Sequence, residues 1–480
     1  MYEKNVTEEG KRIMGGQLKK LFAPVDMTEG RPWEKIVAFT VPLVIGNIAQ
    51  QLYNTVDSII VGRYVGDNAL AAVGSAGPIL NLLLVLFIGI SVGSSVMVSQ
   101  YFGAKEREEL SGTIGSCITL TAIASVIIMA LAPFVIMPML ELLHTPDTII
   151  DWCNSYLRIL FIGIAGVAYY NILSGILRGL GDSVSALIYL LVATVLNIIL
   201  DLWFVAGLGL GVPGVALATA IAQAVSAVLC MWKLTRMKDV FDFRLHYLKM
   251  KKNHAVNIIR LGLPSGLTQA IFSMAMVIVQ SLTNSFGEML IAANVIVMRV
   301  DGFAMMPNFT FGTTMTTYTG QNIGAGRIDR VEKGVKDGLK IGLSVSVVLV
   351  ALILLFGQYL MQMFTSTPEV ISTGMRMLRI LAVGYIAMGV TQILSGVMRG
   401  AGDTMTPMWI SIITTVVLRV PIAYGIAFFT RSAEYPTGRP ESTFISLLVS
   451  WSLGALLTAV AYRFGAWRKR LATAEPAPQL

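Results

Sequence analysis

The stretch NILSGILRGLGDS, residues 171–183, returns as QILSGVMRGAGDT, residues 392–404, and decides how the chain is organised. The copies lie 221 positions apart (392 minus 171) and are identical at eight of thirteen positions. The same offset relates QYFGA, which begins at Gln100, to QNIGA, which begins at Gln321. A chance similarity between apolar segments would not keep one offset at separate places. The sequence therefore predicts a duplicated half.

The composition around these repeats is that of a membrane protein. Of the 480 residues, 55% are hydrophobic and 13% are charged, whereas soluble domains carry about 25% charged residues. A helix needs about 20 apolar residues to cross a bilayer, which predicts an all-α polytopic protein with twelve spans. They cover about 36–62, 71–101, 112–138, 153–178, 183–207, 213–235, 257–284, 290–321, 335–362, 371–398, 405–429 and 441–465.

Basic residues gather in alternate connections between these spans, above all in residues 233–260 and 327–340. The positive-inside rule then places both termini in the cytoplasm, which agrees with an even number of spans. The net charge of +8 is thereby explained by membrane orientation, and no nucleic-acid partner is expected. We expect an integral protein of a bacterial inner membrane.

Six spans per half is an even number, so the two halves are expected to share one orientation, related by a pseudo-two-fold axis along the membrane normal. We predict a cytoplasmic N-terminal segment (1–34), an N-lobe (35–235), a basic cytoplasmic linker (236–256), a C-lobe (257–465) and a cytoplasmic tail (466–480). The charged N-terminus does not resemble a cleavable signal. Substrate would bind between the lobes, and transport would rock one lobe against the other.

Residues typical of enzymes are missing from the sequence. It contains no Walker A, HExxH or GxSxG motif, so we expect neither an enzyme nor a cofactor. Cys117, Cys153 and Cys230 all fall in or beside apolar spans, where packing as small hydrophobic residues is expected.

The repeated RGxGD sequences are expected to form corners on the cytoplasmic side. Positive φ angles at Gly179, Gly181 and their counterparts in the second copy would let the chain turn. Asp182 and its counterpart could cap the helix that follows, and Arg178 and its counterpart could meet lipid phosphate or the cap. Alternatively, each corner is a hinge or gate.

Three polar residues inside apolar spans are the main indication of function: Asp57, Asn197 and Asp201. A charged side chain at membrane depth costs at least a few kcal/mol, so it is usually functional. Asn197 and Asp201 are four residues apart, which places them on one helix face about 6 Å apart. Two carboxylates in a dry lobe would retain one proton or share a cation such as Na⁺. The alternative is a structural polar network between two helices.

Taken together, these segments resemble the multidrug and toxic compound extrusion (MATE) family, over nearly the whole chain from Lys35 to Phe464. The resemblance rests on PLVIGNIAQQLYNTVDSIIVG (residues 42–62), both Q-x-x-G-A loops, both RGxGD corners and the N-x-x-x-D of the fifth span. It implies twelve helices in two six-helix lobes. It also implies export of cationic, aromatic or amphipathic compounds, driven by inward movement of Na⁺ or H⁺.

The resemblance also implies roles for single residues. Asp57, Asn197, Asp201 and Thr219 match the cation-coupling positions of the family and would be the ligands of Na⁺ if Na⁺ is the coupling ion. Pro42 matches a bending proline of the first helix. Further positions expected to line the substrate pocket or to take part in gating are Gln50, Asn54, Gln269, Met274, Asp301 and Met305. Asp301 is either a substrate contact, a proton relay or the structural partner of a nearby arginine.

One branch of the family has a glutamate in helix 7, but the corresponding place in this chain is apolar, near Phe272. The second half has also lost the acid and amide of span 5, since Arg419 lies in that region. Coupling is therefore expected in the N-lobe alone, with bending near Pro42 releasing the cargo. We expect a monomer whose partners are membrane lipid and organic cations or amphipathic compounds. A lipid-linked oligosaccharide flippase is the main alternative; a membrane enzyme or a channel fits less well.

Overall fold

The computed structural model describes residues 24–143, 145–433, 435–465 and 467–468. In this part of the chain the regular elements are helices, and no strand is present. Eleven helices are long and apolar enough to cross a membrane, or twelve when one bent pair is counted as a single span. The predicted all-helical polytopic fold is confirmed. The predicted N-terminal segment and tail lie largely outside the described residues.

Each half of the chain contributes one bundle. The first holds α2 (Pro32–Tyr64), α3 (Asp67–Ala104), α4 (Arg107–Leu142), α5 (Asp147–Ile162), α6 (Ile164–Gly179), α7 (Ser183–Asp201), the π-helix η1 (Leu202–Gly207) and α8 (Gly211–Arg236). After the short 3-10 helix η2 (Leu245–Leu248), the second holds α9 (Lys252–Asn284), α10 (Glu288–Gly324), α11 (Ile328–Gln362), α12 (Pro368–Gly400), α13 (Met405–Ile412), the π-helix η3 (Ile413–Leu418), α14 (Arg419–Phe429) and α15 (Ser442–Phe464).

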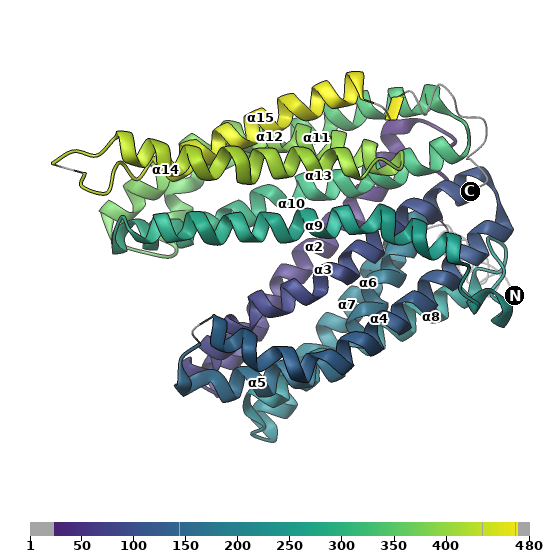
Figure 1. Ribbon diagram of the computed structural model, residues 1–480, viewed down its shortest axis with the longest axis horizontal. Coiled ribbons are helices and arrows are strands. Elements are labelled where there is room, and N and C mark those ends of the chain that lie inside the picture. The colour runs from purple at the N-terminus through teal and green to yellow at the C-terminus, as the bar shows by residue number, and fades with distance from the viewer. Residues whose placement is uncertain (1–23, 144, 434, 466, 469–480) are drawn as a thin grey trace, which may run out of the picture.

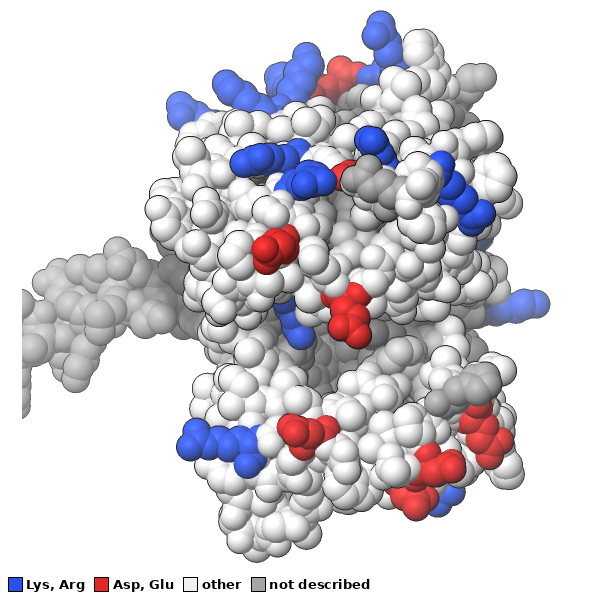
Figure 2. All heavy atoms as spheres, turned by 90° about the vertical axis from the view of Figure 1, so that its left-hand side faces the viewer, with Lys and Arg blue, Asp and Glu red and all other residues white. Residues whose placement is uncertain are grey.

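The bundles meet at one end and diverge toward the other (Figure 1). We call the end with the connection between α8 and α9 the linker face, and the end with the connections α4–α5 and α14–α15 the opposite face. Both repeated corners lie on the linker face, because helices cross the bundle alternately in each direction. Figure 2, which views the opposite face, shows a hollow between the two bundles.

The span expected over about residues 153–178 is bent and consists of two helices, α5 and α6, which meet at 54°. The break falls at Gly163, where α8 crosses. A Cβ on Gly163 would lie 2.5 Å from the Cβ of Ala220 in α8, so the residue must be glycine for α8 to come this close. The sequence did not reveal this bend, because packing between distant helices is not visible in it.

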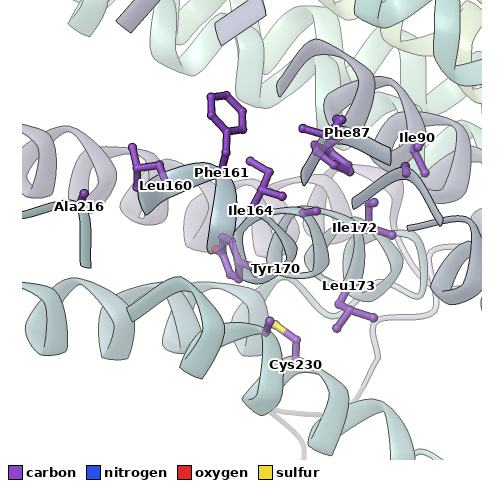
Figure 3. Close-up of a cluster of buried hydrophobic side chains, with 14 of the residues drawn as sticks. Phe87, Ile90, Leu160, Phe161, Ile164, Tyr170, Ile172, Leu173, Ala216 and Cys230 are labelled. Atoms are coloured by element: carbon purple, nitrogen blue, oxygen red, sulfur yellow. The ribbon is translucent and has the colours of Figure 1, made fainter. Parts of the chain in front are cut away.

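Large apolar side chains fill the interior of the first bundle (Figure 3). Phe87 from α3 and Phe161 from α5 are both buried there, beside Ile164 and Leu173 from α6. Cys117, Cys153 and Cys230 are buried and free, which confirms their packing role. In a bilayer such side-chain packing, with interhelical hydrogen bonds, holds helices together.

The two glycines of each corner serve different purposes. Gly181 and Gly402 have φ angles of +89° and +84°, as predicted. Gly179 and Gly400 do not have positive φ angles, contrary to the prediction, because each still belongs to its helix. They allow close packing instead: a Cβ on Gly179 would lie 2.8 Å from the carbonyl oxygen of Ser95, and one on Gly400 would lie 2.4 Å from a backbone oxygen of α10.

The aspartate of each corner caps the next helix, as predicted. Oδ1 of Asp182 accepts a hydrogen bond from the backbone N–H of Ser185 at 2.9 Å, and Oδ1 of Asp403 accepts one from that of Thr406 at 3.1 Å. Such a side-chain cap satisfies one of the free N–H groups at a helix start. These contacts leave both aspartates committed to the corners.

The linker between the bundles is attached to the first bundle. Arg107 at the start of α4 donates from Nη2 to Oδ1 of Asp242 at 2.9 Å. This hydrogen bond holds the pKa of the Asp242 carboxyl below its usual range. The attachment fixes the path of the chain where it crosses from one half to the other.

Candidate functional site

The linker face is closed by backbone packing between the bundles. A Cβ on Gly262 in α9 would lie 2.1 Å from the carbonyl oxygen of Gly89 in α3. A Cβ on Gly103 in α3 would lie 1.9 Å from the carbonyl oxygen of Gln321 in α10. Because glycine has no side chain, helices of different halves touch through their backbones at these points. No passage is left between the helices there.

Residues 25–30, which we call the N-terminal strap, lie across this closed face. The N–H of Val25 donates to the carbonyl oxygen of Gly181 in the first half at 3.2 Å. The N–H of Met27 donates to Oε1 of Gln321 in the second half at 2.9 Å, and the oxygen of Met27 accepts from Nη2 of Arg330 at 2.9 Å. The strap therefore ties both halves together.

The helix α2 also belongs to both bundles. Near the linker face, the hydroxyls of Thr40 and Thr314 in α10 lie 2.9 Å apart, and Nδ2 of Asn47 donates to Oγ1 of Thr310 at 2.8 Å. Asp57, farther along α2, lies in the first bundle. Pro42 sits within the segment that contacts α10, where it removes one helical hydrogen bond.

The expected cation-coupling residues meet inside the first bundle, where α2, α7 and α8 converge. Asn197 and Asp201, on one face of α7, are completely buried. In the amide orientation that satisfies both neighbours, Nδ2 of Asn197 donates to Oδ2 of Asp201 at 2.9 Å, and its oxygen accepts from the N–H of Thr219 at 3.3 Å. The π-helix η1 begins directly after Asp201, and such segments often mark functional sites.

Asp57 faces Asp201 within hydrogen-bonding reach. Oδ1 of each carboxyl is buried and has no hydrogen-bond partner among the described residues. Two facing carboxyls are strongly unfavourable when both are charged, so the pair needs a proton or a cation between them. The groups around the pair that could act as metal ligands are carboxyl, hydroxyl and amide groups, whose oxygen atoms suit a hard cation such as Na⁺. Among the described residues, no cluster of three or more His, Cys, Asp or Glu offers another metal site.

The site also contains two tyrosines that the sequence did not reveal. The hydroxyls of Tyr53 and Thr219 lie 3.2 Å apart, and buried Tyr156 from α5 interacts electrostatically with both carboxyls. Tyr53 precedes Asp57 by one helical turn, which is a usable signal. Tyr156 has none, because a tyrosine in an apolar helix is unexceptional.

A cavity of about 180 Å³ lies on the linker-face side of the first bundle, bounded by α2, α6 and α7. Pro42 and Gln50 line it, together with Ser174 and Arg178. Asn54, one turn beyond Gln50, is exposed and does not line this cavity. The cavity and the carboxyl pair therefore share the helices α2 and α7.

The remaining candidates lie in the second bundle and do not form one site. The hydroxyl of Tyr385 donates to Asp301, which interacts electrostatically with buried Arg419. Met305 is packed in the core of this bundle, at 9% exposure. Gln269 and Met274 are exposed on α9.

Comparison with known proteins agrees with this architecture. The family model described as MatE matches residues 42–203 and again residues 264–425, so each half of the chain is one copy. The chain belongs to the MATE family of transporters. The probable multidrug resistance protein YoeA of Bacillus subtilis is 30% identical to it over 450 residues, which are 92% of this chain and 95% of the relative. The probable multidrug resistance protein NorM of Thermotoga maritima is 24% identical, over 91% and 93% of the two chains.

Solved structures of the family have the same fold. One shows the outward-facing conformation of a multidrug resistance MATE transporter; it superposes with a TM-score of 0.84 at 26% identity, covering 93% of this chain and 98% of the other. A Pyrococcus furiosus transporter of the wider MOP superfamily superposes with a TM-score of 0.85 at 26% identity, covering 94% and 98%. Reversed polarity of its binding pocket is said to suggest a different function, so pocket chemistry must be read separately from the fold.

Proposed function

We propose that the chain is an antiporter that exports cationic and amphipathic organic compounds from bacteria. The driving ion, Na⁺ or H⁺, binds between Asp57 and Asp201 with the help of Asn197 and Thr219. The observation that carries this proposal is the pair of facing carboxyls, each with a buried oxygen that no described group satisfies. The multidrug resistance names of the relatives support drugs as cargo.

The coupling ion acts by binding two conformations of the first bundle with different affinities. When the ion binds, the carboxyl pair loses charge, and the part of α2 that carries Asp57 moves toward α7. Pro42 makes this movement inexpensive, because one backbone hydrogen bond is already missing there. The 180 Å³ cavity shares both helices, so it narrows and releases the cargo.

Alternating access is supported by the difference between the two faces. The linker face is closed by glycine contacts and the N-terminal strap, whereas the opposite face is hollowed between the bundles. We propose that the linker face is cytoplasmic, with both chain ends on that side, and that this conformation opens outward. Cargo loading then requires the linker-face contacts to break.

Ethidium efflux from bacteria that produce the full-length protein tests the proposal. Asp57→Asn and Asp201→Asn are expected to abolish energy-dependent efflux. The reason is that an asparagine side chain carries no negative charge for the coupling ion to neutralise. Asp151→Asn is the matched control, since Asp151 is an exposed aspartate of the same bundle. Efflux that persists in both site variants would show that the carboxyl pair is structural.

Ion replacement in proteoliposomes decides between the two coupling ions. An imposed Na⁺ gradient drives ethidium exchange at constant pH if Na⁺ is the ion, and a pH gradient drives it without Na⁺ if H⁺ is the ion. A protein that binds ethidium but responds to neither gradient would favour the flippase alternative.

A further inference from the structure

A second cavity, of about 70 Å³, lies inside the second bundle between α9, α12, α13, η3 and α15. Its polar lining includes Arg399, Gln392, Ser395, Ser411 and Thr415. Neither the proposed coupling site nor the proposed cargo cavity uses any of them. No carboxylate is among the residues that line it.

Arg399 in this cavity has no ionic partner among the described residues. The nearest acid in sequence, Asp403, is committed to the cap of α13 through Thr406. Asp301 of the same bundle accepts from Tyr385 and interacts with Arg419. An unpaired guanidinium inside a membrane bundle is unfavourable by several kcal/mol unless a counter-charge or water reaches it.

Four other polar side chains of the cavity are also uncommitted. In the described part of the chain, Gln392, Ser395, Ser411 and Thr415 make no side-chain hydrogen bond, although Ser395 and Thr415 are buried at 5% and 7% exposure. Hydroxyl and amide groups can donate hydrogen bonds as well as accept them. Around an unpaired guanidinium, donation to an anion satisfies all of them at once.

The first bundle carries the equivalent arginine in a different setting. Arg178, at the repeat position of Arg399, has Nη1 3.3 Å from Oγ of Ser174, which takes up one of its donors. In the second bundle the matching serine, Ser395, makes no such bond, and Nη2 of Arg399 lies beside the bare backbone of Gly312, 3.4 Å from where a Cβ would be. Arg399 therefore lacks the hydrogen bond that its counterpart makes within its own helix.

We propose that this cavity binds a compact monoanion, a halide or the carboxylate group of a small acid, held by Arg399 and the neighbouring hydroxyls. The volume decides the size class. About 10–15 Å³ of such space holds one water molecule, so 70 Å³ holds an ion of a few heavy atoms and is less than half of the 180 Å³ cavity proposed for cargo. The bound anion neutralises the second bundle, which has no coupling carboxyl pair of its own.

Trp451 lines the same cavity and reports on binding. The purified full-length protein in detergent is titrated with sodium iodide, with gluconate keeping the ionic strength constant, while tryptophan fluorescence is recorded. We expect a saturable quenching component above the linear collisional one. Trp451→Phe is expected to remove the saturable component, because the other six tryptophans do not line the cavity.

Arg399→Gln is expected to weaken iodide binding at least tenfold. Arg379→Gln is the matched control, because it removes an exposed arginine from the same helix. Should Arg399→Gln fail to fold, the double variant Ser395→Ala/Thr415→Val keeps the charge and is expected to bind several-fold more weakly. Linear quenching in the wild type, or saturable quenching that survives in folded Arg399→Gln or is unchanged in the double variant, would overturn the proposal.

Competition between anions shows whether the cavity accepts halides alone or carboxylates as well. Displacement of iodide by chloride alone indicates a halide site, and displacement by acetate as well indicates that carboxylates are accepted; both outcomes support a compact monoanion. Displacement by gluconate at similar concentration would contradict the size argument. Because binding is measured without transport, the result does not depend on the proposed antiport activity.

Discussion

Gln100 and Gln321 hold the same position in the two halves of the chain, and each donates a hydrogen bond to the corner of the other half. Nε2 of Gln100 donates to the carbonyl oxygen of Gly400 at 2.9 Å, and Nε2 of Gln321 donates to that of Gly179 at 3.1 Å. The two repeated sequences, QxxGA and RGxGD, are thus partners across the interface. Duplication has produced a symmetric pair of bonds that hold the linker face closed.

Removal of both glutamine side chains is expected to favour opening of the linker face. The variant Gln100→Ala/Gln321→Ala removes these two bonds and also the one from the N–H of Met27 to Oε1 of Gln321. Each hydrogen bond contributes about 1 kcal/mol net, so the equilibrium shifts by about 3 kcal/mol, or roughly 150-fold. Spin labels on cysteines introduced at Glu106 and Arg327, which are exposed on the linker face of each half, measure the separation. A longer-distance population is expected in the double variant.

Gln358→Ala is the control for this experiment, since Gln358 is exposed on α11 away from the seam. Its distance distribution is expected to match that of the wild type. An unchanged distribution in Gln100→Ala/Gln321→Ala would show that the glutamines do not govern closure.

A bulkier seam is expected to prevent closure altogether. In Gly103→Ala the new Cβ would lie 1.9 Å from the carbonyl oxygen of Gln321, and because that atom is backbone, the helices themselves must separate. Ethidium efflux is expected to fall at least tenfold, with a longer distance between the same two labels. Gly74→Ala is the matched control, because it lies on the same helix with nothing within 4 Å of its Cβ. Normal efflux in Gly103→Ala would contradict a tightly closed seam.

The sequence predicted the main features of the fold and the carboxyl site for identifiable reasons. Polar residues inside apolar runs are rare, so Asp57, Asn197 and Asp201 could be singled out, and helical spacing placed two of them on one face. Thr219 came from family resemblance alone. Its contact with Tyr53 depends on how α2 crosses α8, which no local pattern records.

Other features depended on tertiary packing. The sequence shows that Gln100 and Gln321 occupy the same position in the two repeats. Their hydrogen bonds to the opposite corners, however, depend on how the two halves pack together. The bend at Gly163 follows from the passage of α8, and Met305 packs in the core cluster of the second bundle. Repeats and composition determine the number of helices, whereas approach between backbones determines their partners.

Asn197 is expected to set the affinity of the proposed coupling site. Its amide bonds Asp201 and Thr219 at once, and a hydrogen bond to a charged group contributes about 1.5–3 kcal/mol. Asn197→Ala should therefore shift the coupling-ion concentration for half-maximal efflux by at least tenfold, as measured in proteoliposomes. If H⁺ is the ion, the required concentration falls, because the lost donor no longer stabilises the charged form of Asp201. If Na⁺ is the ion, it rises, because the carboxylate loses the group that positions it. Thr194→Val is the control, because Thr194 bonds only within its own helix, to Leu190. An unchanged ion dependence would remove Asn197 from the site.

The bond between Tyr385 and Asp301 is expected to stabilise the second bundle. Tyr385→Phe leaves a partly buried carboxylate without its donor, which costs about 1–3 kcal/mol. A lower melting temperature of the purified protein in detergent is the expected result. Tyr359→Phe, which removes an exposed hydroxyl from α11, is the matched control and should leave the melting temperature unchanged.

A double-mutant cycle with Asp301→Asn separates this bond from a general loss of packing. If the hydroxyl acts through the carboxylate, Tyr385→Phe lowers the free energy of unfolding by less in the Asp301→Asn background than in the wild type. The expected coupling energy is roughly 0.5–3 kcal/mol. Asp301→Asn alone leaves the buried guanidinium of Arg419 without its counter-charge. This variant should therefore destabilise the protein more than Tyr385→Phe does. Strictly additive effects would mean that the hydroxyl of Tyr385 does not act through Asp301.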